Sequence, residues 1–178
     1  MQIKVLIADI DKKEMIYMNK KKLYIMCGIP GSGKTTWVKN HIKENEVHVS
    51  RDEIRFKMLR ATDSYFSREK EVYKSFCQTI IEKLKTNNAV YADATHISKK
   101  SRKTLINALC IEGLDLKKVD LIAVYLPTKI ETCIARNELR HGRSKVPEKV
   151  IKNTYSLLEK PSREEGFNEI IEVSDENE

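Results

Sequence analysis

Short apolar runs alternate along the chain with longer segments in which apolar residues recur every three or four positions. Each run has the length of a buried β-strand, and each longer segment has the period of a helix with one apolar face. The predicted strands are residues 22–28, 46–50, 88–94, 119–126 and 169–173. Because strands and helices alternate, the sequence predicts an α/β fold with right-handed crossovers and a mostly parallel five-stranded sheet.

A few polar residues and prolines indicate where the helices begin and end. Ser98 is placed to cap the helix after the third strand, and Gly113 to end it. Thr128 and Glu131 have the spacing of a capping box, which predicts a helix after the fourth strand. Pro147 suits the first turn of the last long helix.

Both ends of the chain differ from this pattern. Residues 1–20 contain two short β-like runs around a charged turn, which predicts a short extension that could form a hairpin. Residues 175–178 are polar and mostly acidic, which is typical of a frayed tail. The main domain is therefore expected over residues 21–174.

The length of 178 residues fits one domain with a sizeable core. The net charge of +7 suits an anionic partner such as a nucleotide or nucleic acid, although a lysine-rich solvated surface gives the same value. No apolar stretch approaches the roughly 20 residues of a membrane span, and the first residues lack the pattern of a secretory signal. The four cysteines have no CxxC spacing, which is typical of core residues in a reducing cytosol. We therefore expect a cytoplasmic protein without a membrane partner.

The segment after the first strand reads GIPGSGKT and matches the phosphate-binding pattern G-x-x-x-x-G-K-[ST] without exception. The glycines let the loop curl so that backbone N–H groups point at phosphates, and the next helix adds its positive N-terminal end. Lys34 is expected to reach the β- and γ-phosphates, and the Thr35 hydroxyl to bind Mg²⁺. The expected ATP-binding residues of this loop are Gly28, Gly31, Ser32, Gly33, Lys34, Thr35 and Thr36. The predicted fold class is therefore a P-loop NTPase-type three-layer sandwich.

Two acidic residues follow other predicted strands, and parallel sheets bind ligands beyond such strand ends. Asp52, after the second strand, can accept the proton of an acceptor hydroxyl, and Arg55 can hold an acceptor phosphate with its planar fork. Alternatively, Asp52 caps the next helix while Arg55 pairs with Glu53 or faces solvent. Asp93, after the third strand, has the position of the carboxylate that holds Mg²⁺ in P-loop proteins, with a helix cap as the alternative.

Arginines gather after the fourth strand, in the stretch ARNELRHGRSKVPEKV. Arg136 and Arg140 share one helical face. The basic segment over residues 136–147 is therefore a candidate lid that closes over ATP and places positive charge on the transferring phosphoryl group. A solvated basic turn is the alternative interpretation.

Taken together, GIPGSGKTTW, SRDEIR, ADATHI and RNELRHGRSKVP resemble, in order and spacing, the kinase domain of the phage and bacterial polynucleotide 5′-kinases. The resemblance runs from about residue 23 to residue 173. It implies an enzyme that uses ATP and Mg²⁺ to phosphorylate the 5′-hydroxyl end of DNA or RNA.

The resemblance also implies roles for the residues that match. Asp52 matches the general base that acts on the 5′-hydroxyl, and Arg55 matches the arginine that holds the acceptor's phosphate. Asp93 matches an acidic residue of the active site, and Arg140 matches the lid arginine on the donor phosphates. Arg143 has no clear counterpart, because the stretch after Arg140 is slightly longer than the family pattern. The expected catalytic residues are Lys34, Asp52 and Arg140, and the expected acceptor-binding residues are Asp52, Arg55 and Asp93.

Two other functions are compatible with the same residues. A small-molecule hydroxyl kinase of this fold would phosphorylate a sugar, an antibiotic or a nucleotide-sugar. The aromatic content of 7% indicates no platform for stacking bases, which weakens the prediction of a nucleic-acid acceptor. A nucleotide-gated binding module that transfers nothing is the third candidate, and Asp52 argues against it.

Overall fold

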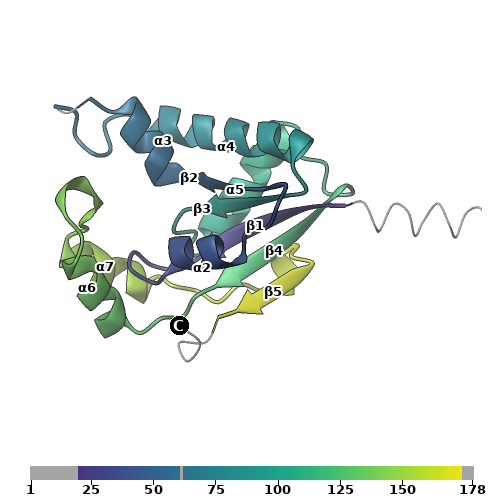
Figure 1. Ribbon diagram of the computed structural model, residues 1–178. Helices are drawn as coiled ribbons and strands as arrows, with labels where there is room; N and C mark the ends of the chain where they lie inside the picture. Colours follow the sequence, from purple (N-terminus) through teal and green to yellow (C-terminus); the bar gives the residue numbers. More distant parts are fainter. Residues whose placement is uncertain (1–19, 61, 174–178) are drawn as a thin grey trace, which may run out of the picture.

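The computed structural model of the chain describes residues 20–60 and 62–173. Within them, five strands form one all-parallel sheet in the order β2-β3-β1-β4-β5 (Figure 1). The strands are β1 (Lys21–Cys27), β2 (Glu46–Ser50), β3 (Ala89–Asp93), β4 (Val119–Tyr125) and β5 (Glu169–Glu172). The five predicted strands and their parallel arrangement are confirmed. The predicted N-terminal extension, apart from Lys20, and the predicted tail lie outside the described residues.

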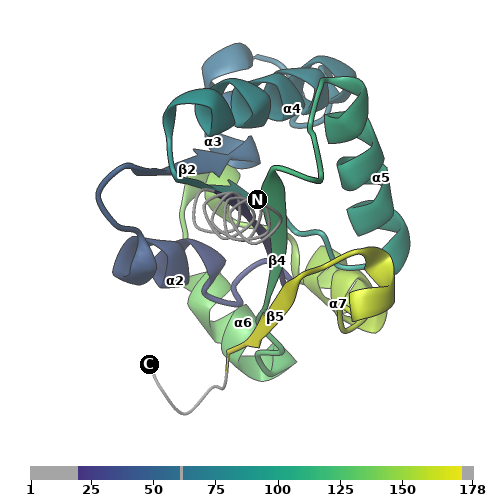
Figure 2. The same cartoon turned by 90° about the vertical axis from the view of Figure 1, so that its right-hand side faces the viewer.

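Helices lie on both faces of the sheet and at its carboxyl end. The helices are α2 (Lys34–His41), α3 (Arg51–Met58), α4 (Glu69–Thr86), α5 (Lys99–Ile111), α6 (Ile130–Glu138) and α7 (Glu148–Ser156), with 3-10 turns η1 (Gly142–Ser144) and η2 (Arg163–Glu165). Helices α4 and α5 cover one face and α2 covers the other, as Figure 2 shows from the end at which β1 begins. Helices α6 and α7 pack through Cys133 and Ile151 onto Ile29, in the loop after β1. The predicted three-layer sandwich is confirmed.

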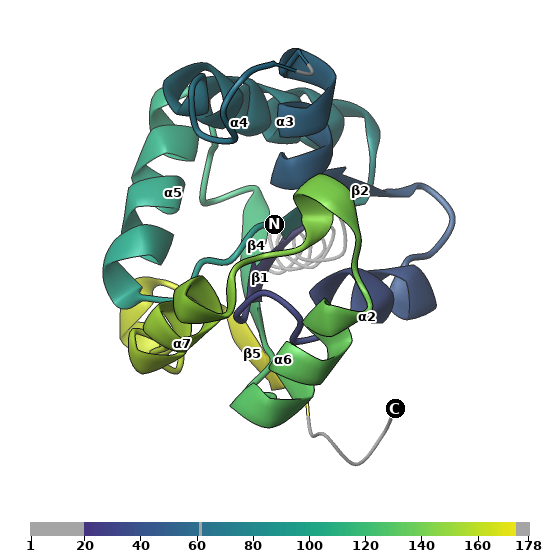
Figure 3. The same ribbon diagram turned by 90° about the vertical axis from the view of Figure 1, so that its left-hand side faces the viewer.

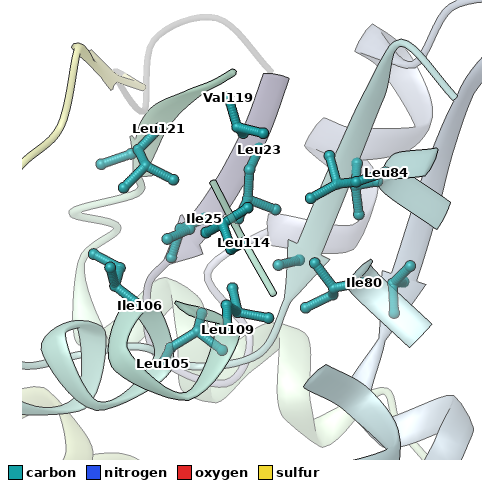
Figure 4. Packing of buried hydrophobic residues seen from close by; sticks show 14 of the residues in the cluster. Leu23, Ile25, Ile80, Leu84, Leu105, Ile106, Leu109, Leu114, Val119 and Leu121 are labelled. Atoms are coloured by element: carbon teal, nitrogen blue, oxygen red, sulfur yellow. The ribbon is translucent and has the colours of Figure 1, made fainter. Parts of the chain in front are cut away.

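The alternation of side chains along β1 accounts for the two layers of core. Leu23 and Ile25 point toward α4 and α5 and belong to the larger cluster of buried residues (Figure 4). On the opposite face, Met26 packs with Trp37 and Val38 of α2. Because both faces of the strand are covered, its sequence is a nearly continuous apolar run, as expected for a strand of a parallel sheet.

The predicted limits of α5 are confirmed. The Ser98 hydroxyl caps this helix by accepting a hydrogen bond from the backbone N–H of Ser101, and Gly113 follows its end with a φ of 105°. Pro147 lies directly before α7 rather than inside its first turn, a difference of one residue.

The predicted capping box of Thr128 and Glu131 is wrong. Helix α6 begins at Ile130 after Lys129, and no side chain in the described part of the chain caps its N-terminus. The Thr128 hydroxyl instead donates to the backbone carbonyl of Ser32 at 3.0 Å, in the loop after β1. This buried contact satisfies both polar groups, so the tertiary partner prevails over the local capping pattern.

A buried ion pair joins α5 to the segment that leads into β5. The Arg102 guanidinium donates to both carboxylate oxygens of Glu165, at 2.8 and 2.9 Å, and its Nη1 donates to the carbonyls of His96 and Glu159. Burial opposes ionisation of Glu165. The hydrogen bonds from Arg102 and from the Ser162 N–H outweigh this effect, so the pKa of Glu165 lies below its ordinary value.

Removing Arg102 is expected to destabilise the fold, because Glu165 would stay buried without its partner. Arg102→Met should lower the free energy of unfolding by about 3–5 kcal/mol, as measured by urea denaturation at pH 7. Because Glu165 has the lower pKa in the folded chain, this contribution is complete above the ordinary pKa of 4.5. It is lost as the pH falls through the pKa of the folded state.

Arg163→Met is the matched control, since Arg163 is an exposed arginine of the same short turn as Glu165. It should change the free energy of unfolding by no more than about 0.5 kcal/mol. Equal stability of the two variants would show that the buried pair does not support the fold.

Candidate active site

The carboxyl ends of the neighbouring parallel strands lie at one edge of the sheet (Figure 3), and the segments that contain the predicted site residues follow these strands in the sequence. The backbone N–H of Gly28, after β1, donates to the carbonyl of Thr95, after β3. The N–H of Leu126, after β4, donates to the carbonyl of Cys27, at the end of β1. Parallel pairing therefore brings together segments that are far apart in the sequence.

The phosphate loop curls around the end of its own lysine. Gly31 and Gly33 have positive φ angles of 86° and 95°, which glycine adopts without strain. The Lys34 ammonium group is buried and donates to the carbonyls of Gly28 and Ile29, at 2.9 and 2.8 Å. Burial lowers the pKa of Lys34, and the nearby carboxylate of Asp93 partly opposes this shift. The described contacts of this cation are therefore with neutral carbonyls.

Close backbone packing fixes the loop against α6. A Cβ atom at Gly31 would lie 2.4 Å from the carbonyl oxygen of Cys133 in α6. A Cβ atom at Gly28 would lie 2.5 Å from the hydroxyl oxygen of Ser32. That hydroxyl is buried and has no hydrogen-bond partner within the described residues. The loop thus has an unsatisfied polar group, which a phosphate oxygen could satisfy.

Thr35, at the start of α2, meets Asp93, at the end of β3. The Thr35 hydroxyl donates to Oδ2 of Asp93 at 2.7 Å, and Nε2 of His48 lies 3.0 Å from the same oxygen. Burial raises the pKa of Asp93, but the contacts with His48 and Thr35 and the charge of Lys34 outweigh it, so the pKa is lowered. A hydroxyl beside an ionised carboxylate suits Mg²⁺, which prefers oxygen ligands.

Metal binding at this edge would need ligands from the nucleotide. No group of three or more His, Cys, Asp or Glu side chains that could hold a metal ion occurs within residues 20–60 and 62–173. Mg²⁺ is commonly held by one or two protein groups together with substrate phosphates. The pair of Thr35 and Asp93 fits that arrangement.

Asp52 lies in the first turn of α3, with its side chain 64% exposed. The hydroxyl of Tyr65 donates to its Oδ1 at 2.7 Å, and Nη1 of Arg55 donates to the same oxygen. The Arg55 guanidinium is itself buried and donates to both oxygens of Glu69. Burial and the bond to Asp52 raise the pKa of Tyr65 to about 12, so the phenol stays protonated and donates. Neither alternative interpretation fits, because the Ser50 hydroxyl caps α3 and Glu69 is the main partner of Arg55.

The predicted lid, residues 136–147, spans the end of α6, the turn η1 and the connection to α7, and Figure 3 shows this segment crossing toward α3. Arg140 is exposed and Arg136 is half-buried. Nη2 of Arg143 donates to the carbonyls of Arg60 and Asp63, in the segment between α3 and α4. The lid therefore contacts the opposite wall of the site.

The charged residues predicted for the site act on one another. Burial lowers the pKa of Lys34, the charge of Arg140 lowers it further, and the charges of Asp93 and Asp52 raise it. The charges of Arg140, Asp93 and Asp52 thus all influence the pKa of Lys34. Thr36, which was predicted to bind ATP, is exposed on α2. The role of each residue stays a prediction.

Sequence reasoning missed two residues of this arrangement, His48 and Tyr65. The sequence does contain a signal for His48. It lies two residues before Ser50, which pairs with Asp93, so the side chains of His48 and Asp93 lie on the same face of the sheet. Tyr65 contacts Asp52 from a separate loop, and nothing in the spacing of the sequence indicates this contact.

A separate hollow of about 440 Å³ lies on the sheet face beside α2. Tyr24 and Tyr91 stack there with ring centroids 4.4 Å apart, and Trp37 stacks on His41 in α2 at 4.0 Å. None of the predicted site residues lines this hollow, so it is distinct from the candidate active site.

In the described part of the chain, no helix combines the length and the hydropathy that crossing a membrane demands.

Comparison with known sequences gives one family. The sequence profile of the AAA domain family matches residues 23–161, which is most of the chain. That range includes every residue predicted for the site. No curated protein sequence matches the chain.

Comparison with solved structures supports the same fold. A chain of the Pnkp1/Rnl/Hen1 RNA repair complex is 24% identical with a TM-score of 0.65, over 79% of this chain and 44% of that one. A fungal RNA kinase is 15% identical with a TM-score of 0.56, over 89% and 77% of the two chains. The tunicamycin resistance protein of Deinococcus radiodurans is 13% identical with a TM-score of 0.58, over 88% of both chains. The chain thus spans less than half of the RNA repair chain that it matches.

Gly31→Ala should impair the phosphate loop more than Gly113→Ala impairs the end of α5. Both glycines have positive φ angles, so alanine costs each about 1–2 kcal/mol of strain. At Gly31 the Cβ atom would also meet the Cys133 carbonyl, whereas at Gly113 it meets no described atom within 4 Å. We expect Gly31→Ala to lower the free energy of unfolding by about 1–3 kcal/mol more, the cost of an overpacked contact.

Urea denaturation measures this difference, and titration calorimetry with ATP tests the site directly. ATP binding should weaken in Gly31→Ala and stay unchanged in Gly113→Ala. Equal losses of stability in the two variants, or equal ATP affinity, would contradict a functional role for the close contact between loop and helix.

Proposed function

The chain belongs to the AAA domain family, and from this premise we propose that it is an ATP-dependent polynucleotide 5′-hydroxyl kinase. Its P-loop kinase-like fold suits phosphoryl transfer in general. The 5′-hydroxyl end of DNA or RNA is the acceptor that we infer from the net charge and from the arginines of the predicted lid.

One observation carries the proposal: Asp52 is an exposed carboxylate that is held in one orientation directly after β2, at the edge of the sheet where the phosphate loop follows β1. Asp52 receives hydrogen bonds from Tyr65 and Arg55, which fix its direction and leave most of its side chain accessible. The charge of Asp52 opposes the burial that lowers the pKa of Lys34. A nucleotide switch that transfers nothing has no use for a carboxylate so placed.

The residues have distinct tasks in the proposed reaction. The Asp52 carboxylate accepts the proton of the 5′-hydroxyl while the hydroxyl oxygen bonds to the γ-phosphorus of ATP. The bond between that phosphorus and the bridging oxygen breaks, and ADP leaves. Lys34, the N–H groups of the loop and Arg140 would balance negative charge on the donor phosphates. Mg²⁺ held by Thr35 and Asp93 would neutralise further charge there when bound.

Arg55 has a less direct place in this scheme. Its guanidinium is buried and paired with Glu69, so it would reach an acceptor phosphate only through the Nη1 edge that faces Asp52 and Tyr65. We propose that this edge orients Asp52 and contacts the phosphate that follows the reacting nucleotide.

Three findings favour a nucleic-acid acceptor. The net charge is +7, the lid carries several arginines, and two structural neighbours are named for RNA repair and RNA kinase. Those likenesses are too distant to transfer an activity, and this chain spans only part of the repair protein. They agree with the acceptor that the net charge and the arginines favour.

A small-molecule acceptor is the second candidate. The tunicamycin resistance protein, whose name concerns a small molecule, matches this chain over 88% of both lengths. An exposed carboxylate at Asp52 would serve a sugar or antibiotic hydroxyl equally well. Salt separates the candidates. A nucleic acid releases counterions when it binds, so its KM rises with salt concentration, whereas the KM of a neutral sugar does not.

Transfer of labelled γ-phosphate from ATP to single-stranded 5′-hydroxyl DNA and RNA tests the proposal. Wild-type protein with Mg²⁺ should label at least one oligomer. Asp52→Asn should lower the rate by about 10²–10⁴-fold, the usual contribution of a general base, while ATP binding by calorimetry is retained.

Glu53→Gln is the matched control, because it removes an exposed carboxylate from the next position of the same helix. Its transfer rate should equal that of the wild type. If ATP binds and neither oligomer is labelled, the proposed acceptor is wrong. Equal rates in the two variants would remove Asp52 from the role of base.

A further inference from the structure

Three aromatic residues form one surface beside Asp52. Phe56 lies on α3, and Tyr65 and Phe66 lie in the segment that leads to α4. The Tyr65 ring contacts Phe66 edge-on with centroids 4.8 Å apart, and Phe56 with centroids 6.1 Å apart. Phe66 is 67% exposed and Phe56 is 38% exposed. We call these three residues the aromatic platform.

Buried polar contacts hold the platform in place. The Arg55 guanidinium lies over the rings of Tyr65 and Phe66, 4.5 and 5.7 Å from their centroids. Glu69 in turn fixes Arg55, and Nη1 of Arg68 donates to the carbonyl at the end of α3 at 2.9 Å. The exposed rings are therefore supported from beneath and present a preformed apolar face.

The platform begins one hydrogen bond away from the predicted general base. The hydroxyl of Tyr65 donates to Asp52 at 2.7 Å, while its ring contacts Phe66. Because Tyr65 contacts both Asp52 and Phe66, a strand whose 5′-hydroxyl reached Asp52 would have its first bases beside these rings. A small sugar bound at Asp52 would leave the platform uncovered.

Charge around the platform suits an anionic chain. Lys57 and Arg60 are exposed next to it, and Arg143 of the lid contacts the carbonyls of Arg60 and Asp63. Aromatic faces bordered by basic side chains are the common surface for single-stranded nucleic acid, because every base has a face that can stack. The sequence analysis predicts no such platform, because only the fold brings the rings of residues 56 and 65 into contact.

We propose that the aromatic platform stacks the first bases of a single-stranded acceptor and so selects nucleic-acid ends over small hydroxyl compounds. The inference rests on the proposed kinase function and specifies its substrate. Phe66, as the most exposed of the three rings, is the specificity-determining residue.

Phosphate transfer to two matched oligomers tests the platform. One is a single-stranded 5′-hydroxyl oligomer with all its bases, and the other lacks the first two bases but keeps the backbone. Phe66→Ala should raise the KM of the complete oligomer by about 5- to 100-fold, as expected for loss of stacking on one base, with little change in kcat. The KM of the abasic oligomer, already high with wild-type protein, should not change.

Two further variants separate stacking from simple packing. Phe66→Trp keeps an aromatic face and should retain the wild-type KM, whereas Phe66→Leu keeps apolar bulk and should behave like Phe66→Ala. Tyr155→Ala is the matched control, since Tyr155 is a partly exposed aromatic residue of α7 outside the platform. Circular dichroism verifies that each variant is folded, and Phe56→Ala provides a second test of the platform.

The outcomes of this experiment are distinct. If wild-type protein labels the complete oligomer and Phe66→Ala and Phe56→Ala leave its KM unchanged, the platform is wrong and the kinase function stands. A wild-type KM in Phe66→Leu would likewise exclude stacking. If wild-type protein labels neither oligomer, the proposed function itself fails, and the platform inference fails with it.

Discussion

The central position of β1 is the constraint on which the rest of the molecule depends. This strand pairs in parallel with β3 on one side and β4 on the other, so three buried strands end at the same edge. Hydrogen bonds from Gly28 to Thr95 and from Leu126 to Cys27 then fix the three following segments against one another. The phosphate loop, Asp93 and the segment between β4 and α6 therefore meet at the carboxyl edge of the sheet.

Two buried cations, Arg102 and Lys34, differ in whether a carboxylate of the protein is paired directly with their charge. Arg102 is paired with the carboxylate of Glu165 and surrounded by carbonyls, so its charge and its donors are used within the protein. Lys34 is also buried, but its hydrogen bonds go to the neutral carbonyls of Gly28 and Ile29. Its charge is thus offset only at a distance, chiefly by Asp93. An entering phosphate would supply the missing negative charge.

The strands, the phosphate loop and the placement of Asp52 and Asp93 could be predicted because each depends on a local pattern and on one rule about strand ends. The contacts of Tyr65 and Arg143 could not, since each joins segments that are separated in sequence and share no motif. The capping error at Thr128 has the same origin. Its local pattern favours a cap, and a backbone carbonyl from another part of the chain is the stronger partner.

The two ends of the lid are joined to each other. The side chain of Asn137 donates to the carbonyl of Val146 at 2.8 Å and accepts from its N–H at 2.9 Å, so the intervening residues form a loop with a closed base. Lengthening such a loop costs little, about 0.6 kcal/mol for each doubling. Because the base stays closed, an insertion between Arg140 and Val146 should perturb the packing of α6 and α7 little, so this segment could accommodate an engineered peptide.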